Sequence, residues 1–139
     1  MGPPRTIPIR FAPLPGEPLD SWLEAYAHRL HATTVGDLLA DLGLRRAGGG
    51  QHAPDHTVWL HHVEAEQVAE ATGVPAHRLH AMTLRTYDGH ILQLDRNPNR
   101  RAVTRSVCWA RGSGSRYCPQ CLSERHGRWL LRWRLSSFI

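Results

Sequence analysis

Apolar residues recur at helical spacing in two stretches of the first half of the chain. The first stripe consists of Trp22, Leu23, Tyr26, Ala27 and Leu30. Such spacing predicts an amphipathic helix with one buried face. Ser21 and Glu24 have the spacing of a capping box, so we expect this helix to begin with Ser21 as its N-cap.

The second stripe consists of Val35, Leu38, Leu39 and Leu42. Thr34 and Asp37 repeat the capping pattern before it, and Gly43 occupies the place of a C-terminal stop. Two helices joined by so short a link predict a helical hairpin or a helix-turn-helix unit.

The segments that flank these two helices are predicted to be irregular. Residues 1–18 contain six prolines and should form an extended arm. The residues that could pin this arm to a core are Ile7, Ile9, Phe11 and Leu14. Residues 45–56 contain three consecutive glycines and predict a flexible loop, with His52 and His56 exposed to solvent.

Two further helices are expected over residues 63–71 and 75–84. The small Ala69, the turn residue Gly73 and the apolar Leu79 have the spacing at which helix-turn-helix units pack. An ordinary helical hairpin packed for stability fits the same spacing. This segment contains three acids that would repel DNA phosphates: Glu64, Glu66 and Glu70. They argue against direct DNA binding by these two helices.

The pattern changes from helical to alternating in the second half. Asp88-Gly89 lies between residues 84–87 and 90–94 and predicts a short hairpin. Apolar residues then alternate with arginines over residues 129–135, which predicts a strand with one basic face. The expected fold class is therefore mostly α. A helix-turn-helix-like region over residues 1–94 should precede an Arg-rich linker and a small partial zinc-finger module with short β-strands over residues 95–139.

Charge is divided unevenly between these two parts. Up to Asp95 there are seven arginines and eleven acids, a net of −4; from Arg96 onward there are ten arginines and one acid, a net of +9, and the two add to +5. This asymmetry predicts a polyanionic partner for the basic part. The arginines expected to contact nucleic acid are Arg116, Arg128, Arg132 and Arg134. A solvated basic face is the alternative interpretation.

Cys118 and Cys121 have the spacing of a zinc knuckle, in which two intervening residues let both thiolates face one Zn²⁺ ion. Cys108 and His126 could supply the other two ligands of a tetrahedral site, although that spacing is unusual. The alternatives are a small buried apolar residue for Cys108 and an exposed turn residue for His126. A redox Cys-x-x-Cys pair would belong in a βαβ setting, which the pattern does not predict.

The remaining sequence features exclude several classes of protein. The N-terminus lacks an apolar signal segment and no run approaches eighteen apolar residues, so we expect a cytoplasmic protein with no membrane span. No nucleophile is paired with an oriented base, and no Walker-type phosphate loop is present. We therefore expect the protein not to be an enzyme.

Three segments, taken in order, resemble the TniQ transposition proteins. They are Leu14-Pro15-Gly16-Glu17-Pro18-Leu19-Asp20-Ser21-Trp22-Leu23, then Ala71-Thr72-Gly73-Val74-Pro75 leading to Met82-Thr83-Leu84, and Arg116-Tyr117-Cys118-Pro119-Gln120-Cys121-Leu122 leading to Trp133-Arg134-Leu135. The resemblance covers about residues 6–138. It implies a further Cys-x-x-His pair after Leu135, so a zinc site completed in that way is expected to be incomplete in a sequence that ends at Ile139.

The resemblance also implies a function. TniQ-like proteins are adaptors for target-site selection that contact DNA or a targeting complex and recruit an AAA+ ATPase, which directs a transposase. The alternative from another class is a helix-turn-helix transcriptional regulator. Such a regulator would read its operator as a homodimer, and a homodimer is a further expectation.

Overall fold

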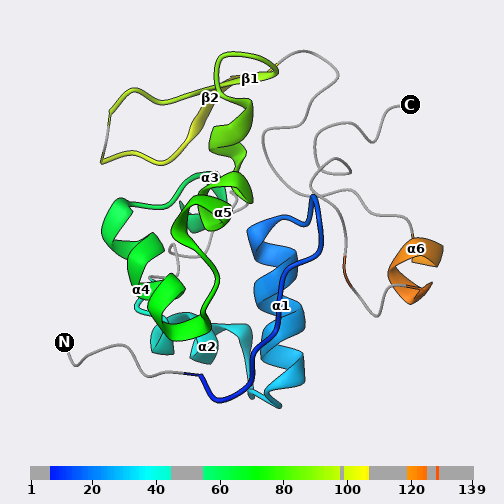
Figure 1. Cartoon of the computed structure of the whole chain (residues 1–139). Helices are drawn as coiled ribbons and strands as arrows, with labels where there is room; N and C mark the ends of the chain where they lie inside the picture. Colours follow the sequence, from blue (N-terminus) through cyan, green and yellow to red (C-terminus); the bar gives the residue numbers. More distant parts are fainter. Residues whose placement is uncertain (1–6, 45–54, 98, 107–118, 125–127, 129–139) are drawn as a thin grey trace.

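The computed structural model describes residues 7–44, 55–97, 99–106, 119–124 and 128, and its elements are mostly helical (Figure 1). The helices are α1 (Leu19–Arg29), α2 (Val35–Asp41), α3 (Asp55–Val58), α4 (His62–Thr72), α5 (Ala76–Ala81) and α6 (Pro119–Glu124), with a 3₁₀ helix η1 (Leu84–Tyr87). The strands are β1 (Leu92–Leu94) and β2 (Val103–Ser106). The mostly α character is confirmed, with one small antiparallel sheet.

Helix α1 begins at Leu19 with Pro18 as its N-cap, so the predicted cap at Ser21 is wrong. Ser21 is buried inside the first turn, where its hydroxyl donates to Oε1 of Glu17 at 3.0 Å. The backbone N–H of Leu19 donates to the carbonyl of Met82 at 3.0 Å. A distant carbonyl, which no local pattern reveals, therefore satisfies an amide at the start of the helix.

Helix α2 is capped as predicted. The hydroxyl of Thr34 accepts from the N–H of Asp37 at 3.2 Å, and the Asp37 carboxylate accepts from the N–H of Thr34 at 2.9 Å. Gly43, with φ of +72°, takes the chain away from the helix end. These bonds span three residues, so the sequence alone contains the information for them.

The core lies between α1, α2 and α4. Its largest fully buried side chains are those of Trp22 and Tyr26, whose rings stack with centroids 5.4 Å apart. The apolar side chains that complete this cluster include Leu23, Leu38, Leu42, Leu60, Val68 and Leu79. The apolar stripes of the sequence are thus the faces that the helices bury.

The proline-rich arm over residues 7–18 is extended, as predicted, and runs along α1 (Figure 1). The N–H of Ile7 donates to the carbonyl of Ala71 at 3.0 Å, and Nε1 of Trp22 donates to the carbonyl of Phe11 at 2.8 Å. Ile7 is buried in the core, whereas Ile9 is exposed. Hydrogen bonds as well as apolar contacts therefore hold the arm against the helices.

The prediction that His56 is exposed is wrong. His56 lies in α3, a single turn that packs against α1 and η1, and only 3% of its surface is accessible. The neighbouring Thr57 is equally buried, and residues 45–54 lie outside the described part of the chain. The composition of residues 45–56 predicted a polar loop, but it did not show that the last residue of this segment, His56, is buried in the folded protein.

Helices α4 and α5 pack against one another across residues 73–75, as either a helix-turn-helix unit or an ordinary helical hairpin would. Gly73 has φ of +77° and its N–H donates to the carbonyl of Ala69 at 2.8 Å. Helix α5 ends at Ala81 rather than at Leu84. The Met82 carbonyl is used by Leu19, and the chain turns at Thr83 so that Leu84 packs against Leu92 in a second, smaller cluster.

The hairpin predicted at Asp88-Gly89 is wrong, because η1 occupies the position of its first strand. Instead β1 pairs antiparallel with β2, with Gln93 opposite Arg105. The Asp88 carboxylate accepts from the N–H of Leu94 at 2.9 Å and so fixes the turn against β1.

The sheet joins residues on both sides of the boundary expected after residue 94, and the division into two domains stays a prediction. The strand expected over residues 129–135 lies outside the described part of the chain. No helix within the described ranges is long and apolar enough to cross a membrane.

Candidate functional site

The predicted zinc ligands fall almost wholly outside the described residues. Cys121 lies in helix α6, but its side chain is outside the described part of the structure. Cys108, Cys118 and His126 lie wholly outside the described residues. Among the residues that the structure does describe, no group of three His, Cys, Asp or Glu side chains could hold a metal ion. The zinc site stays a prediction.

Of the four arginines predicted to contact nucleic acid, Arg116, Arg132 and Arg134 lie outside the described residues. The guanidinium of Arg128 is bound to the carboxylate of Glu17, with Nε to Oε1 at 2.7 Å and a second bond from Nη2 to Oε2. Nη2 also donates to the carbonyl of Ala12 at 3.1 Å. Arg128 therefore faces the arm of the helical part.

We call this cluster the Glu17 junction; it consists of Leu14, Glu17, Ser21 and Arg128. The Glu17 side chain is fully buried and that of Arg128 is 12% exposed. The Glu17 carboxylate also accepts from the N–H of Leu14 at 2.9 Å and from the Ser21 hydroxyl. A buried carboxylate with two donors and a bidentate guanidinium is well satisfied. The junction thus ties residue 128 to the start of α1.

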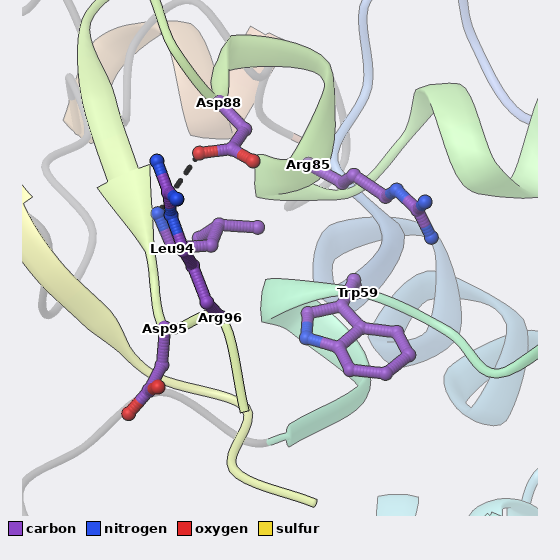
Figure 2. A pocket seen from close by; sticks show the side chains of 6 residues that line it. All are labelled: Trp59, Arg85, Asp88, Leu94, Asp95 and Arg96. Carbon is purple, nitrogen blue, oxygen red and sulfur yellow. Dashed lines mark hydrogen bonds between the residues drawn. The ribbon is translucent and has the colours of Figure 1, made fainter. Parts of the chain in front are cut away.

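A second arginine-rich place is a cavity of about 190 Å³ between α3, η1 and β1 (Figure 2). Its lining residues are Trp59, Arg85, Asp88, Leu94, Asp95 and Arg96, and we call it the Trp59 cavity. Trp59 comes from the turn after α3, Arg85 from η1, and Arg96 from just beyond β1. The fold therefore brings together three segments that are apart in the sequence.

Two guanidinium groups lie near the Trp59 ring, with their carbons at 5.9 Å (Arg85) and 5.4 Å (Arg101) from its centroid. Arg101 is held by both oxygens of Glu64, at 2.8 and 2.7 Å, and by the Trp59 carbonyl at 3.0 Å. Burial alone would raise the pKa of Glu64, but hydrogen bonds and charges from Arg101 and His61 lower it overall. Arg101 is therefore a structural cation.

Arg85 and Arg96 differ from Arg101 because both are exposed and neither side chain has a hydrogen bond or ion pair with any described residue. The two acids of the lining keep their negative charges but have partners other than Arg85 and Arg96. Asp88 accepts from Leu94, while Asp95 accepts from the N–H of Asn97 at 2.9 Å and lies 3.7 Å from Arg100. The carboxylate of Asp95 points away from Trp59 (Figure 2). The arrangement can bind an anion.

The charge of Arg85 also acts on the nearby His80. The pKa of His80 is lowered by partial burial first, and then by the charges of Arg85 and His62. The sequence did not reveal this cavity, because its lining residues come from separate segments, and Trp59 is only half-buried. The sequence signal was an excess of arginines over residues 84–106, which contain five arginines and two acids. Which of these residues line one cavity depends on the fold.

Comparison with known proteins gives one informative result. The family model for TniQ matches residues 8–138, nearly the whole chain. No curated protein sequence and no solved structure matches it. Because the match extends from the arm through both arginine-rich regions, the chain belongs to the TniQ family.

Proposed function

We propose that this protein is an adaptor for target-site selection in transposition. It would bind DNA through its arginine-rich part and recruit an AAA+ ATPase, which in turn directs the transposase. The family match over residues 8–138 carries the proposal, because it supports an accessory role in transposition. The net charge of +9 from Arg96 onward supports DNA as the polyanion.

The proposed phosphate contacts are Arg116, Arg132 and Arg134. Arg128 was predicted to contact DNA as well, but this contact has the least support of the four. Its guanidinium would have to leave the Glu17 carboxylate before it could bind a phosphate.

Duplex binding tests the DNA part of the proposal. Affinity for a short labelled duplex should fall steeply between about 50 and 200 mM salt, because bound phosphates release counterions. Arg132→Ala with Arg134→Ala should weaken binding and lower the salt slope by about two, without unfolding the protein. Arg10→Ala with Arg29→Ala removes two exposed arginines from the helical part and is the charge-matched control. Salt-independent binding, or no binding, would contradict the proposal.

Recruitment is tested with the ATPase itself. The full-length chain should be retained by an AAA+ transposition ATPase assembled on DNA with ATP, and less so without nucleotide. Retention by the transposase alone would reverse the proposed order of contacts.

We also propose that Cys118 and Cys121 bind Zn²⁺, with Cys108 and His126 as the remaining ligands. Three thiolates and an imidazole are an adequate tetrahedral donor set for zinc. Purified protein should contain about one Zn²⁺ per chain, and Cys118→Ser should lose it. Equal metal content in both proteins would exclude the knuckle.

The helix-turn-helix regulator remains the second candidate, because α4 and α5 pack across a tight turn at Gly73. Helix α5 has only six residues, however, which is fewer than two turns for reading a major groove. Sequence-specific binding of a homodimer to a palindrome, independent of an ATPase, would favour this candidate over the adaptor.

A further inference from the structure

The Trp59 cavity is lined by two arginines and two acids, and neither arginine forms an ion pair with a described carboxylate. Arg85 lies beside the Trp59 ring, and Arg96 lies across the cavity at the end of β1 (Figure 2). A planar guanidinium group without an ion-pair partner can form a bidentate hydrogen bond with a phosphate or carboxylate. The volume of about 190 Å³ is far above the roughly 10–15 Å³ that one water needs, so a phosphate group with bound water can enter.

We propose that the Trp59 cavity binds a backbone phosphate of DNA through Arg85 and Arg96, with Trp59 as a positioning residue. Trp59 acts through Arg85: its ring attracts the guanidinium and limits its rotamers. Arg101, locked to Glu64 and to the Trp59 carbonyl, fixes the ring from another side. The site thus has one cation held by an aromatic ring and one at the end of a strand.

The charges around the cavity favour a continuous polyanion over a single carboxylate. Residues 84–106 contain five arginines and two acids, a net of +3, and Glu64, which binds Arg101, lowers this to +2. Exposed arginines occur on η1 (Arg85), after β1 (Arg96) and on β2 (Arg105), so basic groups extend beyond the cavity along the sheet. DNA presents phosphates at regular intervals and can use such a series, whereas an acidic peptide needs a matched sequence.

This inference rests on the proposed function for its ligand, but it assigns the contact to a different part of the chain. The adaptor proposal places DNA on Arg116, Arg132 and Arg134. The cavity adds a contact on the face formed by η1 and the sheet, and the two sets of arginines can be removed separately.

The test uses the full-length chain and a short labelled duplex of mixed sequence. Arg85→Gln with Arg96→Gln should lower affinity at about 50 mM salt on the order of tenfold or more. It should also reduce the slope of log affinity against log salt by about two contacts, because two phosphate-neutralising groups are lost. Arg29→Gln with Arg10→Gln removes the same charge from the α1 end and the arm, and should retain the wild-type slope to within about half a contact.

Trp59 variants separate positioning from folding. Trp59→Ala should lower the slope by about one contact, and Trp59→Phe should restore it, since a phenyl ring also attracts a guanidinium. If Trp59→Ala fails to fold, the arginine double variant and Trp59→Phe still decide the question.

The outcomes distinguish the two proposals. If the cavity variant binds DNA as the Arg29/Arg10 control does, while Arg132→Ala with Arg134→Ala weakens binding, the cavity assignment is wrong and the adaptor proposal stands. Binding of a polyglutamate peptide that depends on Arg85 and Arg96, with DNA binding unchanged, would overturn the assignment in favour of a protein partner. A wild-type chain that binds no duplex would overturn both.

Discussion

The Glu17 junction and the Trp59 cavity each place an arginine beside an aromatic ring, with opposite results. Arg128 lies 4.5 Å from the Phe11 centroid, is bonded to a fully buried carboxylate and is 12% exposed. Arg85 lies 5.9 Å from the Trp59 centroid, is exposed, and has no ion pair among the described residues. The comparison shows that a count of arginines predicts a basic protein but not which guanidinium groups are available to a ligand.

The junction also explains how a residue near the end of the chain can stabilise the helical part. Arg128 bonds a carboxylate 111 positions earlier, and that carboxylate accepts from the first turn of α1 and from the arm. In the cavity Asp88 and Asp95 accept backbone N–H groups instead, and Asp95 also lies 3.7 Å from Arg100. Glu17 neutralises Arg128, whereas Asp88 and Asp95 form no ion pair with Arg85 or Arg96.

The largest expected effect comes from breaking the junction. Arg128→Ala should lower the free energy of unfolding by about 3–5 kcal/mol, because the Glu17 carboxylate stays buried without its cation. Arg85→Ala should change it by less than about 0.5 kcal/mol, as for other exposed residues. Urea unfolding of the two variants, followed by circular dichroism, measures the difference. Equal small losses would show that the ion pair contributes little.

Two glycines, one facing the arm and one next to the Trp59 cavity, give a smaller contrast in stability. Gly73 faces the Arg10 side chain of the arm, and Gly89 follows Asp88 of the Trp59 cavity. The φ angles of Gly73 and Gly89 are +77° and +80°. Alanine at either position should cost about 1–2 kcal/mol through its left-handed backbone.

Gly73→Ala should cost about 0.5 kcal/mol more, because its Cβ would lie 2.2 Å from Nη1 of Arg10 and the guanidinium must move. A Cβ at Gly89 meets nothing within 4 Å of the described atoms. Thermal unfolding of both variants tests the order, and a larger loss for Gly89→Ala would contradict it.

The smallest effect is a pH dependence at Glu64, which neutralises Arg101 beside the same tryptophan that Arg85 approaches. Its pKa is lowered in the folded protein, so its contribution is present above its ordinary value of 4.5 and is lost as the pH falls through the lower folded value. Wild type should therefore lose stability more steeply than Glu64→Gln below about pH 4.5, by up to about 1 kcal/mol. Arg101→Gln should show the same reduced slope, measured by urea unfolding at stepped pH, and parallel curves would refute the assignment.

Local features of the fold could be predicted because their determinants lie within four residues. The apolar stripes of α1 and α2 and the Thr34 cap are of this kind, and the structure confirms them. The start of α1 could not be predicted, since Met82 supplies an acceptor for its first amide. The hairpin at Asp88-Gly89 was mispredicted for a similar reason, because the partner of β1 lies beyond an intervening loop.

The features of the candidate site can also be separated into those visible in the sequence and those that depend on the fold. The asymmetry of charge and the resemblance to TniQ proteins were visible in the sequence, and the family match confirms the second. The Arg128–Glu17 pair and the convergence of Trp59, Arg85 and Arg96 were not visible.

The sequence by itself determined the helical stripes, the family and the excess of arginine in the second half. Only the tertiary structure decided which arginine is neutralised and which is available, and whether His56 is exposed or buried. The physical reason is that periodicity and caps depend on neighbours in the chain. Burial and ion pairing depend on neighbours in space, and these exist only after the chain has folded.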